Sequence, residues 1–284
     1  MRTEGGEGEM TQTQQKKSEA LRKLHARPGP VISGCPWDVG TARIMTALGL
    51  EALGTASSGL AQSTGRKDAE GMIPRDEMLK WAGAIAAATP LPVTADLENG
   101  WGDSPKDCAA TIRATAEAGL AAGTIEDAKD DGSHTLYDIA HATERIAAAQ
   151  EAARKTGFVL VARADAFLHG IKDLDDVIRR AQSYEAAGAD VIFAPGLPDL
   201  KSIKELCAAV SKPVTALVGR GGTVTLKDLT EAGVKEISLG STLYRTALGT
   251  LFNAIEEIQS KGTFTFEKNS VPYEKLNGYM QGRK

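Results

Sequence analysis

The sequence predicts a single α/β domain folded as a (β/α)8 barrel, a closed ring of parallel strands surrounded by helices. Eight short apolar segments alternate along the chain with eight segments whose apolar residues recur every three or four positions. Doubly wound sheets have about six strands, so eight alternating pairs favour a closed barrel. The length of 284 residues also fits one barrel, since such domains run to about 250 residues.

The ends of the chain are predicted to lie outside the barrel repeat. Residues 1–13 are polar and rich in Gly, Glu and Gln, so we expect a disordered head there. Residues 14–25 have helix-forming composition, and Pro28 ends that N-terminal helix. The barrel domain therefore covers residues 14–284 and carries a C-terminal helical extension. Its tail, from about residue 263, has no clear period and is expected to pack on a neighbour or stay mobile.

The eight strands and eight helices are assigned from apolar runs and helical periodicity. The expected strands cover residues 31–35, 52–57, 92–98, 123–127, 158–165, 190–195, 213–218 and 236–240. The expected helices cover residues 39–48, 74–88, 105–118, 139–155, 174–187, 200–210, 225–232 and 243–260. Proline in the first turn, as at Pro105, and glycine after the last turn, as at Gly119, agree with these bounds.

Charge and cysteine content exclude several classes of function. The net charge of −4 argues against binding to nucleic acid or to an anionic membrane surface. Cys35, Cys108 and Cys207 are too few and too widely spaced for a disulfide framework or a zinc site. No segment is long and apolar enough to be read as a membrane span. We therefore expect a cytoplasmic protein that has a small-molecule substrate and no nucleic-acid or membrane partner.

Two carboxylates follow the third expected strand. Asp96 and Glu98 are two positions apart, and alternate side chains of a strand share one face, so both should point into the barrel mouth. Like charges so close repel each other unless one is protonated or a cation lies between them. Carboxylate oxygens are ligands that Mg²⁺ prefers. The pair therefore indicates a magnesium site, with a solvated acidic loop as the alternative.

Glu126 and Asp127 end the fourth expected strand. Neighbouring strands lie about 4.8 Å apart, so the one carboxylate that points into the mouth could reach the same cation, directly or through water. A helix N-cap or a loop salt bridge is the alternative.

Arg163 ends the fifth strand, where its planar guanidinium suits the carboxylate or phosphonate of a substrate. A structural ion pair of Arg163 with Asp165 or Glu126 is the alternative.

Small and acidic residues follow the first two strands. The hydroxyl and amide groups of Ser57, Ser58 and Gly59 can hold a carboxylate. Asp38, next to Trp37, and Asp68 in the following loop can contact a metal through water, and turn chemistry is the alternative for each motif. Residues 219–222 and 238–241 form glycine-rich turns after strands seven and eight, where barrels often bind phosphate.

These motifs together resemble the isocitrate lyase and phosphoenolpyruvate mutase superfamily. The segment that follows the third strand is similar to its Asp-x-Asp/Glu-x-Gly-x-Gly signature, and it reads Asp96-Leu97-Glu98-Asn99-Gly100-Trp101-Gly102. The other motifs occur in matching order over about residues 31–258. The resemblance implies a Mg²⁺-dependent TIM barrel, with Mn²⁺ as a possible substitute, that stabilises an enolpyruvate. It also implies a homotetramer that exchanges the eighth helix.

The resemblance also implies the role of each residue. Asp96 would bind the metal directly, and Glu98, Glu126 and Asp68 would act through waters. Arg163 would hold an acidic group of the substrate. The expected catalytic residues are Asp68, Glu126 and Arg163, the expected metal ligands are Asp96, Glu98 and Glu126, and the expected substrate contacts are Trp37, Asp38, Ser57, Ser58, Gly59 and Arg163.

Departures from the family pattern select among its reactions. Residues 129–137 lack the Lys-Lys-Cys-Gly-His loop of the lyase branch, and residues 194–196 lack the histidine of the mutase branch. Decarboxylation needs neither residue, because the metal alone can stabilise the enolate as a Lewis acid. We therefore expect a carbon–carbon lyase similar to oxaloacetate decarboxylase. One alternative is a lyase for 2-methylmalate-like acids in which His134 or Tyr137 replaces the cysteine. The others are a 2-methylisocitrate lyase-like enzyme, a carboxyphosphonoenolpyruvate or phosphoenolpyruvate phosphonomutase-like enzyme, and a non-catalytic dicarboxylate-binding barrel.

Overall fold

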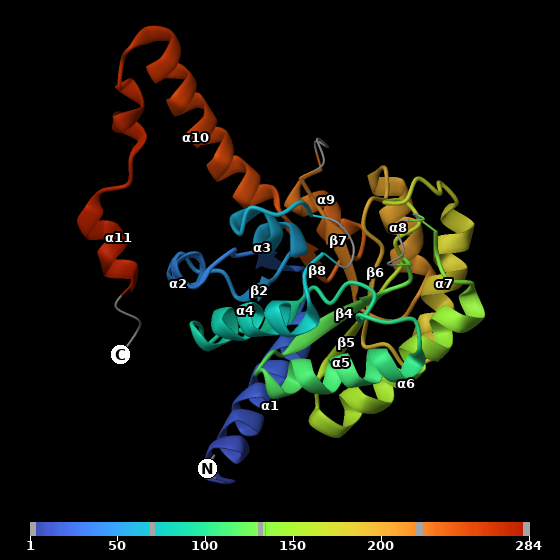
Figure 1. Cartoon of the computed structure of the whole chain (residues 1–284). Helices are drawn as coiled ribbons and strands as arrows, with labels where there is room; N and C mark the ends of the chain where they lie inside the picture. Colours follow the sequence, from blue (N-terminus) through green and yellow to red (C-terminus); the bar gives the residue numbers. More distant parts are fainter. Residues whose placement is uncertain (1–3, 69–71, 130–132, 134, 220–223, 281–284) are drawn as a thin grey trace.

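The protein is a closed barrel of parallel strands that pair in sequence order from β1 to β8 (Figure 1). The computed structural model describes residues 4–68, 72–129, 133, 135–219 and 224–280, with side chains from residue 12 onward. The predicted (β/α)8 TIM barrel is confirmed. The strands are β1 (Val31–Gly34), β2 (Ala52–Gly54), β3 (Val93–Ala95), β4 (Ala122–Glu126), β5 (Val159–Arg163), β6 (Val191–Phe193), β7 (Val214–Leu217) and β8 (Glu236–Ser238).

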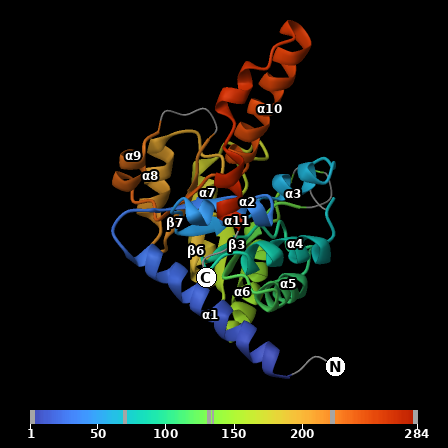
Figure 2. The same cartoon turned by 90° about the vertical axis from the view of Figure 1, so that its left-hand side faces the viewer.

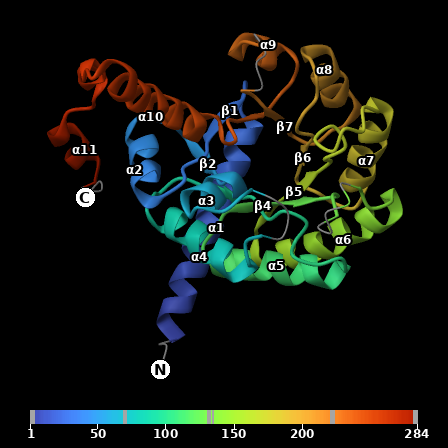
Figure 3. The same cartoon turned by 45° about the horizontal axis from the view of Figure 1, so that its top comes forward.

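Helices surround the barrel, as the view toward its mouth shows (Figure 3). They are α2 (Val39–Ala47), α3 (Ser57–Ser63), α4 (Arg75–Ala87), α5 (Pro105–Glu117), α6 (Ile139–Thr156), α7 (Leu174–Ala186), α8 (Leu200–Ala209), α9 (Leu226–Glu231) and α10 (Thr242–Lys261). All agree with the predicted bounds to within one residue except α3, which was not predicted. Among the described residues, none of the helices combines the length and apolar character needed to cross a membrane.

Local capping explains why the helix bounds could be predicted. Ser104 caps α5 by accepting a hydrogen bond from the Asp107 amide, while the Asp107 side chain accepts from the Ser104 amide in return. Asp173 caps α7 in the same way through the Asp176 amide. Gly157 ends α6 in the left-handed conformation, at φ 69°, that glycine adopts without strain.

The N-terminal helix is longer than predicted. Helix α1 covers Glu4–Ala26, so the prediction of a disordered head over residues 1–13 is wrong from Glu4 onward, and residues 1–3 lie outside the described residues. Nucleation of a helix costs free energy, whereas adding residues to an existing helix costs little. A helix that is stabilised by packing on the barrel can therefore extend into the polar residues that precede it.

Helix α1 closes the end of the barrel at which the strands begin (Figure 1). Leu21 is fully buried in a cluster with Val31, Ala52, Ala122, Val159, Val161, Val191 and Phe193, which come from five of the strands. Ser18 adds a hydrogen bond of 2.7 Å to the Ala121 carbonyl. An apolar cluster around Leu21 therefore fills much of the interior beside α1.

We expect Leu21→Ala to lower the free energy of unfolding by about 2–5 kcal/mol, because it leaves a cavity among packed aliphatic side chains. Urea titration followed by circular dichroism measures the change. Ala20 on the same helix is partly exposed, and Ala20→Ser is the control that should leave the midpoint almost unchanged. Equal midpoints for Leu21→Ala and the wild type would contradict the packing described for α1.

The C-terminal segment contains two helical elements in the region predicted as a tail without period. Helix α10 points away from the barrel, and the chain returns through the 3-10 helix η1 (Thr265–Asn269) to α11 (Tyr273–Met280) (Figure 2). Helix α11 lies beside α2 (Figures 1 and 3), and Arg43 Nη1 donates a hydrogen bond of 2.6 Å to the Met280 carbonyl. The predicted helical extension is confirmed, and its last helix contacts the barrel of its own chain.

Candidate functional site

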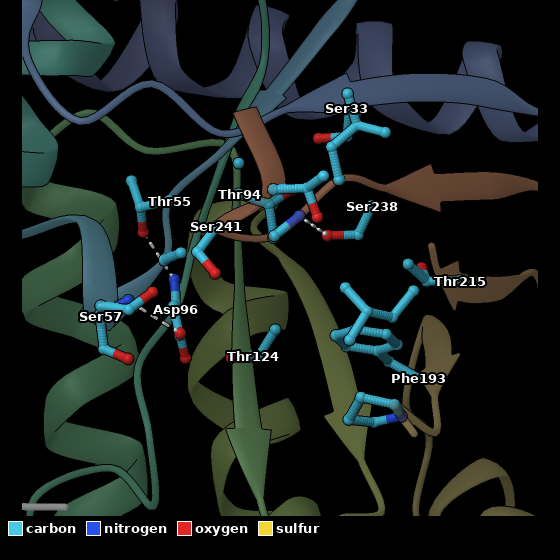
Figure 4. Close-up of a pocket in the computed structure, with 18 of the residues that line it drawn as sticks. Ser33, Thr55, Ser57, Thr94, Asp96, Thr124, Phe193, Thr215, Ser238 and Ser241 are labelled. Carbon is cyan, nitrogen blue, oxygen red and sulfur yellow. Dashed lines mark hydrogen bonds between the residues drawn. The ribbon is translucent and has the colours of Figure 1, made fainter. Parts of the chain in front are cut away.

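A cavity of about 690 Å³ opens where the strands end. It is lined by loop residues that follow the strands and by hydroxyl-bearing side chains that point inward from them (Figure 4). Ligand pockets typically have about 300–1,000 Å³, and barrel enzymes carry their active sites at this end. Its lining includes Ser33, Ser57, Ser58, Asp68, Thr94, Asp96, Thr124, Arg163, Phe193, Thr215, Glu236, Ser238, Ser241 and Arg245.

Asp96 is held at the cavity wall by three hydrogen bonds that each involve a main-chain amide, of which Figure 4 shows those with Thr55 and Ser57. Its own amide donates a hydrogen bond of 2.9 Å to Thr55 Oγ1, which fixes the backbone directly after β3. Its carboxylate accepts from the Ser57 amide at 3.2 Å and from the Glu98 amide at 3.4 Å. These contacts fix the position of the Asp96 carboxylate relative to the cavity.

Arg163 lies among the carboxylates that end the neighbouring strands. Its Nη1 lies 3.3 Å from Asp96 Oδ1 and 3.0 Å from Glu126 Oε2. Its Nε and Nη2 donate to the two oxygens of Asp165, at 2.6 and 2.7 Å. Both structural ion pairs considered as alternatives for Arg163 are therefore present. Arg163 also lines the cavity, so its contact with a substrate stays a prediction.

Negative charge is in excess around this one arginine. We call Asp96, Glu98, Glu126 and Asp165 the acidic cluster. Burial raises the pKa of Glu126 well above its usual value, and the charges of the other three carboxylates raise it further while Arg163 opposes them. Burial likewise raises the pKa of Asp165. Among the described residues, Asp96, Glu126 and Asp165 share the Arg163 guanidinium, and a divalent cation beside Asp96 would offset the repulsion between these carboxylates.

The acidic cluster fits Mg²⁺ in the chemistry of its donors. All four side chains offer carboxylate oxygens, and Mg²⁺ binds to one or two carboxylates while keeping several waters. Asp96 alone among them lines the cavity, whereas Glu98 and Glu126 are buried behind it. Within the described ranges, no three acidic, histidine or cysteine side chains are arranged to hold a metal ion by themselves. A direct bond from Asp96 and water-mediated contacts from its neighbours are the arrangement that fits.

The expectation that Asp96 and Glu98 share one face of a strand is wrong. Strand β3 ends at Ala95, and Glu98 has a left-handed backbone with φ 46°. The two-residue alternation of side chains therefore stops before Asp96. Glu98 does not line the cavity. It lies close enough to Glu126 for the Glu98 charge to raise the pKa of Glu126.

Ser57, Ser58 and Asp68 line the cavity as predicted, whereas Trp37, Asp38 and Gly59 are outside its lining. Ser57 and Ser58 form the first turn of α3, which replaces the end of the strand predicted there. The roles of all six in substrate or metal binding stay predictions.

The residues that do not line the cavity have structural contacts. Asp38 caps α2 by accepting a hydrogen bond of 2.6 Å from the Thr41 amide, which is the turn chemistry considered as its alternative. The carbonyl of Trp37 accepts from Trp81 Nε1 at 3.0 Å, and its ring packs edge-on against Tyr244. A Cβ at Gly59 would lie 3.4 Å from Trp37, so Gly59 allows this close approach.

Two residues were considered as substitutes for the missing loop cysteine, and the structure describes one of them. His134 lies outside the described residues. Tyr137 is buried, and its hydroxyl donates a hydrogen bond to Asp103. Burial raises the pKa of Tyr137 to about 12, and Tyr137 does not line the cavity. The structure therefore does not support Tyr137 as the proton-transfer residue.

Two charged residues of the cavity were not found from the sequence. Arg245, one turn into α10, lines the cavity and has no carboxylate partner among the described residues. The sequence signal that could have identified Arg245 is a basic residue just after the eighth strand. Glu236, the first residue of β8, also lines the cavity and lies 2.8 Å from His25 Nε2 of α1. Glu236 and His25 lie 211 positions apart in sequence, so no local signal links them.

Cys35, which follows β1, has a buried free thiol, and the reactivity of this thiol tests its burial. Burial raises the pKa of its thiol to about 12. We expect iodoacetamide at pH 8 to modify Cys35 at least about 100-fold more slowly in the folded than in the unfolded protein, as peptide mapping by mass spectrometry would show. Because folding raises this pKa, the stabilisation from burying the thiol is complete below about pH 8.5 and is lost as the pH rises toward about 12. Equal rates in both states would contradict this burial.

Comparison with known proteins agrees with this architecture. The family model described as phosphoenolpyruvate phosphomutase matches residues 21–259. An oxaloacetate decarboxylase from Ectopseudomonas mendocina is 31% identical and covers 84% of this chain and 83% of its own. A 2-methylisocitrate lyase from Shewanella oneidensis is 29% identical and covers 79% and 80%, respectively.

Similarity to solved structures extends over nearly the whole chain. The crystal structure of a Burkholderia cenocepacia J2315 protein, described provisionally as a lyase/mutase, has a TM-score of 0.92 and 44% sequence identity. The match covers 96% of this chain and 98% of the other. The chain therefore belongs to the phosphoenolpyruvate phosphomutase family.

Proposed function

We propose that the protein is a Mg²⁺-dependent carbon–carbon lyase that acts on a small 2-oxo or 2-hydroxy dicarboxylic acid. The observation that carries this proposal is the acidic cluster, in which Asp96, Glu126 and Asp165 share Arg163 and Asp96 lies at the cavity wall. Relatives named oxaloacetate decarboxylase and 2-methylisocitrate lyase support lyase chemistry. Decarboxylation of an oxaloacetate-like acid is the simplest reaction that these residues can carry out.

The cavity lining includes groups suited to both ends of such a substrate. Asp96 would hold Mg²⁺, or Mn²⁺ in its place, with Glu98, Glu126 and Asp68 contacting its waters. When bound, the ion would supply a Lewis acid that withdraws electrons from a 2-oxo group. Ser57 and Ser58, next to Asp96, would hold the carboxylate beside that group. Arg245 has no carboxylate partner among the described residues and would bind the distal carboxylate.

The protein has to orient the bond that breaks. Arg163, held by Asp165 and Glu126, would face the reacting end of the substrate from the cavity wall. The bond between C3 and the departing carboxylate breaks, its electron pair stays on the substrate, and carbon dioxide leaves. A proton from water then adds to C3 and gives pyruvate. These reaction steps require no side-chain base, which agrees with the absence of the loop cysteine of the lyase branch.

Oxaloacetate with Mg²⁺ tests the proposal directly. We expect purified protein to release pyruvate, measured by coupling to lactate dehydrogenase, well above the rate of an equal concentration of the Asp96→Ala variant. That variant also controls for spontaneous decarboxylation in the presence of Mg²⁺. Release of pyruvate at the same rate from both proteins would refute decarboxylase activity.

Cleavage of a longer 2-hydroxy acid is the second candidate. The cavity of about 690 Å³ is within the range that holds drug-sized ligands and exceeds what a four-carbon diacid requires. A relative named 2-methylisocitrate lyase supports this alternative. Pyruvate release from 2-methylisocitrate that His134→Ala abolishes would favour it over decarboxylation, because cleavage of a 2-hydroxy acid requires a base.

We further propose a homotetramer in which α10 is exchanged between subunits. Leu251, Phe252 and Ile255 on this projecting helix are 51%, 65% and 46% exposed. Large exposed apolar patches indicate interaction sites, and a second copy of the chain would cover this one. Sedimentation velocity should give a tetramer for the wild type and smaller species for Phe252→Asp. A monomeric wild type would exclude the exchange.

The proposed compartment is the cytoplasm. Cys35, Cys108 and Cys207 are all free thiols in the structure, as a reducing compartment favours. The net charge of −4 supports the absence of a nucleic-acid or membrane-surface partner.

A further inference from the structure

The loop that carries Asp96 and Glu98 has an unfavourable backbone. We call residues 96–104, between β3 and α5, the acidic loop. Glu98 and Trp101 within it have φ values of 46° and 56°, although neither is glycine. Such conformations are unfavourable for residues other than glycine and persist only where surrounding contacts fix them. The Trp101 amide donates to Asn99 Oδ1 at 2.9 Å within the loop, and further contacts come from outside it.

Arg145 provides such contacts from the middle of α6. Its side chain is only 1% exposed. Nη2 donates hydrogen bonds to the carbonyls of Asn99 and Gly102, the latter at 3.0 Å. Nη1 donates to the carbonyl of Glu126 at 3.1 Å. One planar group therefore ties the acidic loop to the end of β4, and these two segments carry Asp96, Glu98 and Glu126.

Neighbouring contacts limit how far this guanidinium can move. It stacks over the ring of Tyr137 at 4.2 Å, and the Tyr137 hydroxyl donates to Asp103, also in the acidic loop. The Glu126 amide donates a hydrogen bond of 3.1 Å to the Glu98 carbonyl, which joins the same two segments directly.

The partners of Arg145 show what its charge is used for. It takes part in no ion pair among the described residues, and its Nε has no hydrogen-bond partner. It donates to three main-chain carbonyls. Hydrogen bonds that involve a charged group are stronger than neutral ones, so these can offset the cost of the left-handed residues.

We propose that Arg145 is a positioning residue that sets the affinity of the acidic cluster for a divalent cation. It does so by fixing the backbone that carries Asp96 and Glu98 relative to the backbone of Glu126. This inference rests on the proposed function, in which the acidic cluster binds Mg²⁺. Arg145 itself touches neither the cavity nor a substrate.

Isothermal titration of the full-length protein with Mg²⁺, in the absence of any substrate, measures this role. We expect Arg145→Ala to weaken Mg²⁺ binding about 10- to 100-fold, the usual effect of removing a group that orients metal ligands. Arg145→Lys should be intermediate, because an ammonium group cannot form the planar fork that reaches carbonyls of two segments. Millimolar guanidinium should restore part of the affinity of Arg145→Ala, and the same concentration of sodium should not.

Ile146→Ala is the matched control, since Ile146 is the next residue on α6 and is 2% exposed in the apolar core. It should lose stability and keep wild-type Mg²⁺ affinity. If Arg145→Ala does not fold, the Mg²⁺ affinity of Arg145→Lys provides the test. Mg²⁺ affinity within twofold of wild type in the folded Arg145 variants, or an equal loss in Ile146→Ala, would overturn the inference and leave the proposed function intact. If Asp96→Ala binds Mg²⁺ as the wild type does, both fail.

Discussion

Replacing Asp96 by asparagine is expected to lower kcat with oxaloacetate by about 10³-fold, equivalent to about 4 kcal/mol of transition-state stabilisation. Asparagine keeps the shape of the side chain and an oxygen that can accept from the Ser57 amide, so the change removes mainly the negative charge. The effect is large because Asp96 is the member of the acidic cluster that lines the cavity. Initial rates at saturating Mg²⁺ provide the measurement.

Asp199→Asn is the control for this prediction. Asp199 caps α8 by accepting a hydrogen bond of 2.8 Å from the Ser202 amide and is not part of the cavity lining. Asparagine caps helices about as well as aspartate, so both activity and stability should stay close to wild type. An Asp96→Asn enzyme with more than a tenth of the wild-type kcat would argue against a direct contact between Asp96 and the metal.

Asp127→Ala is expected to have the largest effect on stability, a loss of about 3–5 kcal/mol in the free energy of unfolding. Asp127 is 2% exposed and accepts hydrogen bonds from Arg180 Nη1 at 3.1 Å, Tyr184 Oη at 2.6 Å and the Asp165 amide at 2.8 Å. Its removal leaves a buried guanidinium without its full set of partners. Burial and the Asp127 charge both raise the pKa of Tyr184, so this hydroxyl stays protonated as a donor.

Urea denaturation of single and double variants separates the ion pair from simple loss of packing. In Asp127→Ala, Arg180 keeps its ion pair with Asp176, at 2.6 Å from Nε. The Asp127→Ala/Arg180→Met double variant should therefore recover only part of the lost stability, because it removes a buried guanidinium that has lost one of its two carboxylate partners. Glu151→Ala, which removes an exposed pair with Lys155, should leave the urea midpoint unchanged. A double variant no more stable than the single one would contradict the proposed cause.

The barrel could be predicted from the sequence because each of its repeats carries local signals. Apolar runs predicted the strands, and signals such as Pro105 in a first turn and Gly119 after a last turn predicted the helix ends to within one residue. The short helices α3 and α11 were missed for opposite reasons. The serines that begin α3 extend an apolar run and look like the end of a strand, and α11 has no buried residues to give it a clear period.

The site could be predicted only as a set of residue types at strand ends. Asp96, Glu126 and Arg163 do meet, because parallel strands place their carboxyl ends together. The direction of Glu98 could not be predicted, since it depends on a left-handed residue beyond the strand. The contacts of Arg145 with Asn99 and of Arg180 with Asp127 join residues 46 and 53 positions apart, and no local pattern encodes them.

The central claim is that the acidic cluster binds one divalent cation through Asp96. A crystal structure grown with Mn²⁺, with an anomalous difference map at the manganese edge, tests it most directly. The account predicts a single peak about 2.1 Å from an Asp96 carboxylate oxygen, with Arg163 Nη1 moved away from that carboxylate. A cavity without a peak, in which Arg163 still bridges Asp96 and Glu126 as at 3.3 and 3.0 Å here, would contradict it.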